Sequence, residues 1–136
     1  MPSFQVSLVR PDALVFSGQA DQVDLPGAEG DMGVLAGHAP IVTMLRPGIV
    51  KVFASSRDEE FVVMGGVAEF ARSDLTILTE AAAAIGEFDV AGLKAQIEER
   101  ERNLPTVPIG QELDREIAML DHYRSLHRYL TVTTAA

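Results

Sequence analysis

The chain of 136 residues carries a net charge of −9 and contains no cysteine. Its length fits one compact domain, or a small domain with an appendage, and 47% apolar with 23% charged residues is the composition of a globular protein. The acidic balance argues against a nucleic-acid partner, which would need clustered Lys and Arg. Without cysteine, disulfides and thiolate chemistry are excluded.

No segment of the sequence is as long and apolar as a membrane span. Residues 1–12 lack the basic head and the apolar stretch of a signal peptide. We therefore expect a cytosolic chain that meets a membrane only through a partner.

The first part of the chain, up to about residue 80, has the pattern of β-strands. Apolar Phe4, Val6 and Leu8 alternate with polar residues, which is the period of a half-buried strand. Ile49–Phe53 is a strongly β-branched run, and after a polar turn Glu60–Met64 follows as its hairpin partner.

A second hairpin is expected from Val67–Arg72 and Leu75–Thr79, across a turn at Ser73–Asp74. Before it, Gly65–Gly66 allows a bulge or a sharp bend. Strands this short and evenly spaced predict an antiparallel β-sandwich, or flattened barrel, over residues 1–84. Its predicted core consists of Phe4, Val6, Leu8, Leu14, Phe16, Val23, Leu25, Leu35, Val50, Val52, Val63, Val67, Phe70, Leu75 and Ile77.

After residue 80 the pattern becomes helical. Ala81–Ala84 is a run of helix formers, and Asp89 is a candidate N-cap for a helix at about 89–104 that Pro105 and Pro108 end. A second helix is expected at about 111–130, and the pair predicts an antiparallel helical hairpin over residues 85–136. The two apolar stripes are Val90, Leu93, Ile97 and Leu104, and Leu113, Ile117, Leu120, Tyr123, Leu126 and Leu130.

Motifs of catalysis and ligand binding are missing from the sequence. The glycines of residues 27–33 match neither a dinucleotide nor a phosphate loop, so we interpret them as turn glycines. His38 stands alone, and His122 and His127 fall on different faces of a helix, so no metal site is expected. There is no G-x-S-x-G motif. We expect no cofactor and no catalytic activity of the chain alone.

The stretch Leu25–Gly48, LPGAEGDMGVLAGHAPIVTMLRPG, resembles the signature segment of the epsilon subunit of rotary, F-type ATP synthases. That family reads approximately LPG-x-x-G-E/D-x-G-I/V-L-x-GHAP-L/I-x-T-x-L-x-PG. SLVRPD, FSG at Phe16–Gly18 and MGGVAEF also stand in family-like positions, so the resemblance covers nearly the whole chain. The matching residues of the segment are Leu25, Pro26, Gly27, Gly30, Asp31, Gly33, Val34, Leu35, Gly37, His38, Ala39, Pro40, Ile41, Thr43, Leu45, Pro47 and Gly48.

The resemblance implies a non-catalytic rotor subunit in the central stalk of a proton-translocating ATP synthase. Members of the family bind the gamma subunit and the ring of c subunits, and they couple proton-driven rotation to ATP synthesis in the alpha/beta hexamer. It also implies a peripheral place on the cytoplasmic face of the bacterial inner membrane. Carried over to this chain, the partner contacts are Asp31, Met32, Gly33, His38, Gly65 and Gly66.

In many members the C-terminal hairpin regulates ATP hydrolysis, folding down with bound ATP or extending into the hexamer to inhibit. ATP-binding members open the first helix with I/L-D-x-x-R-A. The aligned residues Phe88–Leu93 keep Asp89 but have Gly92 in place of the arginine, the residue best suited to pair with phosphate. A similar string at residues 120–125 is interpreted as a salt-bridging helix face. We expect no nucleotide binding, and weak inhibition or none.

Two other interpretations stay open from the residues alone. One is a β-sandwich adaptor with a helical hairpin that binds some other protein, and the other is a small enzyme or nucleotide sensor. The rotor interpretation predicts a stable complex with a gamma subunit. The sensor predicts tight ATP binding by the isolated chain.

Overall fold

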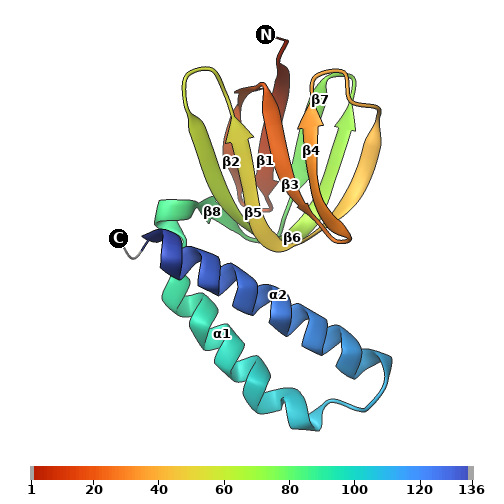
Figure 1. Cartoon of the computed structure of the whole chain (residues 1–136), viewed down its shortest axis with the longest axis vertical. Helices are drawn as coiled ribbons and strands as arrows, with labels where there is room; N and C mark the ends of the chain where they lie inside the picture. Colours follow the sequence, from red (N-terminus) through yellow and green to blue (C-terminus); the bar gives the residue numbers. More distant parts are fainter. Residues whose placement is uncertain (1, 135–136) are drawn as a thin grey trace. The chain divides into compact units, whose positions relative to one another are not determined.

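The computed structural model describes residues 2–134, and side chains up to residue 132. The chain divides into two compact units, Met1–Phe88 and Asp89–Ala136. The first is built of β-strands and the second of two antiparallel helices (Figure 1), which is the expected fold class. The division lies four residues beyond the expected boundary at residue 84, because residues 82–84 form a strand of the first unit.

The β-unit is one continuous sheet in the order β2-β1-β7-β6-β5-β3-β4, and β8 pairs with β6. Among the strand pairs of residues 2–134, β1 and β7 run parallel and the others are antiparallel. The sheet folds back on itself into two facing layers (Figure 1), because the long strands β5 and β6 belong to both. The strands are β1 Phe4–Arg10, β2 Ala13–Ala20, β3 Gln22–Gly27, β4 Gly30–Leu35, β5 Ile41–Phe53, β6 Asp58–Ala71, β7 Asp74–Leu78 and β8 Ala82–Ala84.

Strand β6 passes through Gly65 and Gly66, which have φ angles of 93° and 135°. These angles suit glycine, so the strand bends here without ending. The two strands expected at Glu60–Met64 and Val67–Arg72 are therefore parts of one continuous strand, β6. The hairpin turn between β6 and β7 is Arg72–Ser73, one residue earlier than expected, with both φ angles positive as in a type I′ turn.

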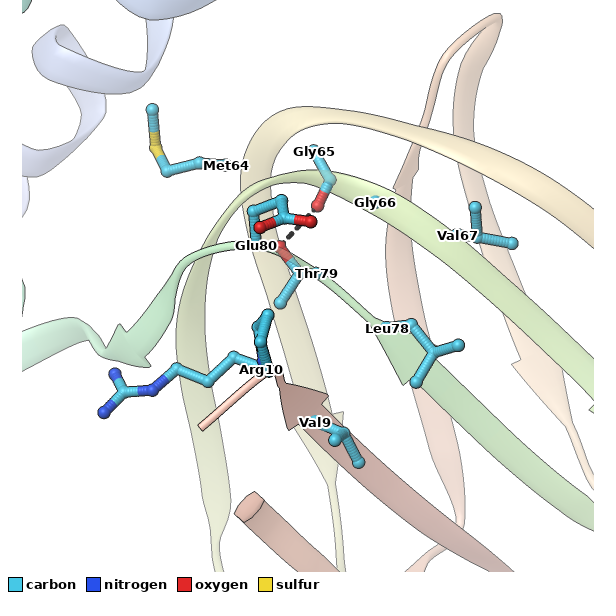
Figure 2. A pocket seen from close by; sticks show the side chains of 10 residues that line it. Val9, Arg10, Met64, Gly65, Gly66, Val67, Leu78, Thr79 and Glu80 are labelled. Atoms are coloured by element: carbon cyan, nitrogen blue, oxygen red, sulfur yellow. Dashed lines mark hydrogen bonds between the residues drawn. The ribbon is translucent and has the colours of Figure 1, made fainter. Parts of the chain in front are cut away.

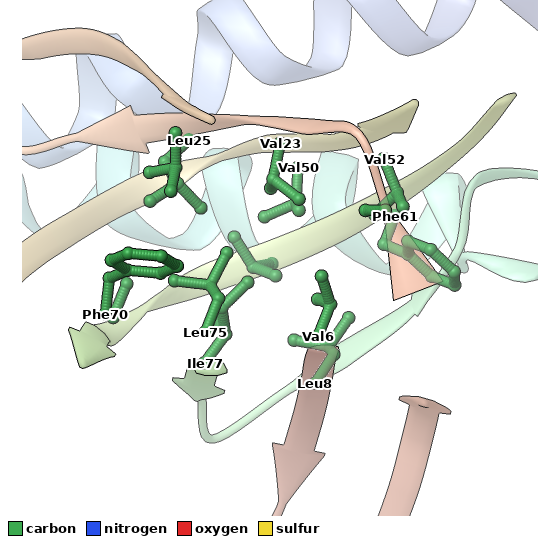
Figure 3. Packing of buried hydrophobic residues seen from close by; sticks show 14 of the residues in the cluster. Val6, Leu8, Val23, Leu25, Val50, Val52, Phe61, Phe70, Leu75 and Ile77 are labelled. Atoms are coloured by element: carbon green, nitrogen blue, oxygen red, sulfur yellow. The ribbon is translucent and has the colours of Figure 1, made fainter. Parts of the chain in front are cut away.

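The interior between the layers is filled with aliphatic and aromatic side chains (Figure 3). Phe4 meets Phe70 edge to face at 5.5 Å between ring centroids, and Phe16 meets Phe61 at 5.2 Å. The sequence overlooked Ala20, Val34, Leu45, Phe61, Ala68 and Ala82. Predicted core residues that are buried are Phe4, Val6, Leu8, Val23, Leu25, Val50, Val52, Val63, Phe70, Leu75 and Ile77, while Phe16 and Val67 are partly exposed.

The prediction is wrong for two residues that were expected in the core, because Leu14 is 62% exposed and Leu35 is 54% exposed. Strand β2 has a bulge, since Leu8 pairs with Phe16 but Val9 pairs with Leu14, which leaves Val15 as the extra residue. The bulge shifts the alternation and turns Leu14 outward. On β4, pairing with β3 decides which side chains face the core. Val34 lies opposite the buried Val23, so Leu35 faces outward.

The run Ala81–Ala84 is not helical. Ala82 and Ala84 pair with Val63 and Phe61 as strand β8, and Ala82 is buried. The free edge of β6 supplies hydrogen-bond partners for this segment, and tertiary context of this kind overrides helix propensity.

The second unit contains α1 Val90–Asn103 and α2 Gln111–Thr134, which contact each other along the hairpin. Short 3₁₀ turns at Ile85–Glu87 and Leu104–Thr106 precede and follow α1. Asp89 caps α1, because its Oδ1 accepts a hydrogen bond from the Gly92 N–H at 2.9 Å. The buried stripe residues are Leu93, Ile97, Leu120, Tyr123, Leu126 and Leu130, whereas Ile117 is 42% exposed.

Candidate functional site

A row of apolar side chains crosses the outer face of the sheet. Met44 on β5 pairs with Val67 on β6, Val67 with Leu78 on β7, Leu78 with Val9 on β1, and Val9 with Leu14 on β2. Side chains directly opposite each other in a sheet point to the same face. With strands about 4.8 Å apart, this apolar row is about 19 Å long.

The apolar row is open to solvent. Met44 is 61%, Leu78 54% and Leu14 62% exposed, and Val9 and Val67 are half-buried. Two residues further along the strands, the same face carries the polar residues Glu69, Thr76, Ser7 and Ser17 in register, with the exposed Val42 of β5 opposite Glu69. An outward sheet face is normally polar in this way, so the apolar row is a local departure of the kind that marks a protein-binding surface.

A pocket of about 450 Å³ opens beside the apolar row. Val9, Val67 and Leu78 of the row form one wall, and Met64, Gly65, Gly66 and residues 10–11 and 79–80 complete it (Figure 2). The structure thus places the predicted pair Gly65 and Gly66 at the wall of a pocket.

The strand segment around the glycines is fixed by Thr79, which directly follows β7. The Thr79 hydroxyl lies 2.6 Å from Gly65 O and 3.1 Å from Ala81 O, so it can donate to either carbonyl. A Cβ atom on Gly66 would lie 2.2 Å from Leu78 O. Only glycine therefore lets β6 and β7 approach this closely.

The hairpin turn at residues 28–31, which includes the first two residues of β4, carries the predicted contact Asp31. Arg46 of β5 donates to Gly27 O at 2.5 Å and pairs with the Asp31 carboxylate. The Ala28 N–H donates to Met44 O at 2.8 Å, so this turn lies next to the end of the apolar row. Asp31 keeps 78% of its side chain exposed, and an exposed pair of this kind contributes roughly 0.2–1 kcal/mol.

The other predicted contacts of this segment differ in exposure. Gly33 is exposed on β4, and a Cβ there would lie 3.3 Å from Asp24 Oδ1. Met32 points the other way and packs against the core cluster. His38 is half-buried, with its ring edge-on to Phe70 at 6.0 Å and its Nδ1 2.7 Å from Ala39 O. These contacts make His38 a residue that fixes the loop between β4 and β5.

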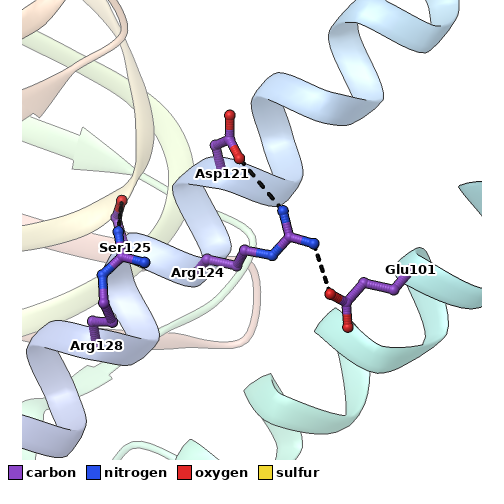
Figure 4. A network of polar contacts seen from close by, with 5 residues as sticks. All are labelled: Glu101, Asp121, Arg124, Ser125 and Arg128. Atoms are coloured by element: carbon purple, nitrogen blue, oxygen red, sulfur yellow. Dashed lines mark hydrogen bonds and ion pairs between the residues drawn. The ribbon is translucent and has the colours of Figure 1, made fainter.

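Ion pairs join the two helices of the hairpin. Arg124 on α2 contacts Glu101 on α1 at 2.6 Å and Asp121 at 3.5 Å (Figure 4). The hydrogen bond from Arg124 to Glu101 raises the pKa of its guanidinium. The string at residues 120–125 therefore forms a salt-bridging face, as the sequence indicated.

Arg100 on α1 forms the second cross-helix pair, with Glu116 at 2.8 Å, and its guanidinium lies 4.7 Å from the centre of the Tyr123 ring. Burial disfavours the charge of Arg100, but the hydrogen bond with Glu116 and the electrostatic interactions with Tyr123 and Glu116 outweigh it, so its pKa is raised. Asp89, the residue kept from the nucleotide motif, is used as a helix cap.

Within residues 2–134 no cluster of three or more His, Cys, Asp or Glu side chains could hold a metal ion. In the same part of the chain no helix has the length and hydropathy to cross a membrane.

Residues 3–85 match the family model of the ATP synthase delta/epsilon chain β-sandwich domain. The chain is 55% identical over 135 residues to an ATP synthase epsilon chain 2 from Nitrobacter hamburgensis, covering 99% of both chains. It is 47% identical over 133 residues to an ATP synthase epsilon chain from Rhodopseudomonas palustris strain HaA2, covering 98% of both.

Solved structures of ATP synthases contain the same fold. A chain in the Euglena gracilis mitochondrial ATP synthase, OSCP/F1/c-ring, superposes with a TM-score of 0.76 at 26% identity, covering 96% of this chain and 83% of that one. A chain in the central stalk/c-ring of the Tetrahymena thermophila enzyme gives 0.63 at 16% identity, covering 96% and 95%, which shows the fold alone. The chain therefore belongs to the family of ATP synthase epsilon chains, which are non-catalytic subunits of that complex.

Proposed function

We propose that this chain is a rotor subunit in the central stalk of a proton-translocating ATP synthase. It binds the gamma subunit through the apolar row and the c ring through the turn that holds Asp31, and so couples proton-driven rotation to ATP synthesis. The apolar row is the observation that supports this proposal most directly.

The gamma subunit is the partner that suits the apolar row. A subunit that transmits torque needs a permanent interface, and permanent interfaces are more apolar than the rest of a protein surface. The row lies on five hydrogen-bonded strands over a fully packed core, so the surface is stiff. Gly65 and Gly66 belong to the same surface through the adjoining pocket.

The c ring is the partner that suits the turn between β3 and β4. Glu29, Gly30 and Asp31 are exposed there, and Arg46 holds the turn in one shape. An acidic, solvent-exposed turn forms polar contacts that do not depend on deep burial. Gly33 extends the contact along β4, and His38 acts by fixing the neighbouring loop.

The hairpin reaches the alpha/beta hexamer and inhibits ATP hydrolysis weakly or not at all. Arg124 is already paired with Glu101 and Asp121, and Arg100 with Glu116, so these two cations are less available to attract an acidic surface. Asp89 caps α1 and Gly92 offers no cationic side chain, so nucleotide binding is not expected. In the assembled enzyme the chain is peripheral on the cytoplasmic face of the bacterial inner membrane.

The test is binding of the full chain to the gamma subunit from the same source, by pull-down and native mass spectrometry. We expect a one-to-one complex. Leu78→Ser should weaken it about tenfold or more, as for a central interface residue. Leu35→Ser is the matched control, since both leucines are 54% exposed but Leu35 lies on β4. If the unmodified chain binds no gamma subunit at any salt concentration, the proposal is wrong.

The c-ring contact is tested separately with Asp31→Lys. This variant should bind the gamma subunit normally and lose affinity for the gamma–c-ring subcomplex, because it places a positive charge beside Arg46 and reverses the sign of the turn. Equal loss of both partners would show that the turn belongs to the gamma interface instead.

A further inference from the structure

We propose that the pocket beside Gly65 and Gly66 is a socket for one bulky apolar side chain of the gamma subunit, with a basic residue next to it. The inference rests on the proposed function and adds to it a single anchoring point. The apolar row alone could slide against a smooth partner surface, whereas an occupied socket fixes the relative position of the two subunits.

The walls of the pocket have the chemistry of an anchor site. Val9, Val67 and Leu78 belong both to the pocket and to the apolar row, so a partner covering the row also covers the pocket mouth. Met64 lines it as well, and its flexible thioether adapts to the shape of an incoming side chain. Interface energy is concentrated where one large side chain fills a pocket of this kind and the surrounding contacts exclude water.

The pocket is held open by the backbone. Gly65 and Gly66 add no side chains to fill it, and their positive φ angles bend β6 at this point. The hydroxyl of the buried Thr79 donates a hydrogen bond to Gly65 O, which fixes β6 against the segment that follows β7. The socket therefore exists before a partner arrives, and binding does not have to pay for forming it.

The charge at the mouth of the pocket determines which charged residue of the partner fits beside its apolar anchor. Arg10 is engaged by Asp12 at 2.8 Å and by Ala82 O at 3.0 Å, and in Figure 2 its side chain runs away from Val67 and Leu78. Glu80 is exposed at the pocket, and within residues 2–134 no hydrogen bond or ion pair engages its carboxylate. The charge left at the mouth is negative, so the complementary partner carries Lys or Arg beside its apolar anchor.

The test fills the socket in the full-length chain. Val67→Phe places a ring into the pocket, and Val42→Phe makes the same change at a 65% exposed position on the same sheet face outside the pocket. We expect Val67→Phe to weaken binding of the gamma subunit at least tenfold and Val42→Phe to weaken it less than threefold. Unchanged binding by Val67→Phe, with the unmodified chain binding normally, overturns the socket and leaves the proposed function intact.

Two further measurements test the socket even if Val67→Phe does not fold. Glu80→Gln should weaken the complex a few-fold and reduce the dependence of its affinity on salt, because one ion pair is lost. In the unmodified chain, the methyl NMR signal of Met64 should shift and lose exposure to a soluble paramagnetic probe when the gamma subunit binds. A Met64 signal that is unaffected by a formed complex also overturns the socket.

Discussion

The two units of the molecule are stabilised in different ways. The β-unit surrounds an apolar cluster that includes Val6, Val23 and Ile77 at 0% exposure, and its ion pairs, such as Arg10–Asp12 and Arg57–Glu59, lie at the surface. In the hairpin, pairs such as Arg100–Glu116 and Arg124–Glu101 cross from one helix to the other. Apolar packing involves no charges for salt to screen, whereas partly exposed ion pairs are screened by it.

The difference suits two separate roles. A packed core with paired strands resists deformation under load, as the proposed rotor-binding unit requires. A hairpin of two narrow helices that relies in part on charge can change conformation at small cost, because marginal helices depend on their packing. The comparison predicts that substitutions act differently in the two units, with the largest effects in the β-unit.

The largest expected effect is in the core of the β-unit. Ile77→Ala should lower the free energy of unfolding by roughly 2–5 kcal/mol, since it leaves a cavity among fully buried neighbours. Leu14→Ala, an apolar truncation on the exposed face, should change it by less than about 0.5 kcal/mol. Urea unfolding followed by circular dichroism measures both. Similar losses for the two variants would place Leu14 in the core after all.

The next effect concerns the backbone of β6. Gly66→Ala places a Cβ atom 2.2 Å from Leu78 O and at a φ of 135°, so we expect a loss of roughly 2–3 kcal/mol from strain and crowding. Gly86→Ala is the control, because a Cβ there has no atom within 4 Å. The midpoint of urea unfolding should fall for Gly66→Ala only. Equal stability of the two variants would show that β6 relaxes at its bend.

Local patterns predicted much of the fold, and pairing between distant segments accounts for the failures. Alternation alone identified Phe4, Val6 and Leu8, because each strand residue faces the side opposite to its neighbours. It failed at Leu14, where one extra residue in β2 changes the phase. It failed again at Ala82, whose strand exists only because the edge of β6 is free.

The candidate site was less accessible to sequence analysis than the fold. The apolar row joins Leu14, Val9, Leu78, Val67 and Met44, which lie far apart in the chain and meet only through the sheet order. A signal did exist, since Val9 and Leu78 are apolar at positions where the strand alternation requires polar residues. The family resemblance selected Asp31, Gly65 and Gly66 but gave no hint of Arg46, which reaches the Asp31 turn from β5.

In the hairpin we expect smaller effects, beginning with the cap of α1. Asp89→Ala removes the acceptor of the Gly92 N–H and should cost about 1 kcal/mol of hairpin stability. Asp89→Asn keeps an acceptor oxygen and should cost only a few tenths of that, within the range of good capping residues. Amide hydrogen exchange in the first turn of α1 reports the difference. Equal exchange rates in both variants would mean that the cap does not stabilise the helix.

The smallest effect, and the one most specific to the hairpin, is the loss of a cross-helix ion pair. Arg100→Met should reduce hairpin stability by about 0.5 kcal/mol at low salt, because the pair with Glu116 is partly exposed. Lys94→Met, an exposed cation on the same helix, is the control. The difference between the two variants should shrink in about 1 M salt, where charges are screened within roughly 3 Å. If the difference persists, the contribution of Arg100 comes from its stacking on Tyr123 and its packing. The hairpin would then be stabilised mainly by packing, as the β-unit is.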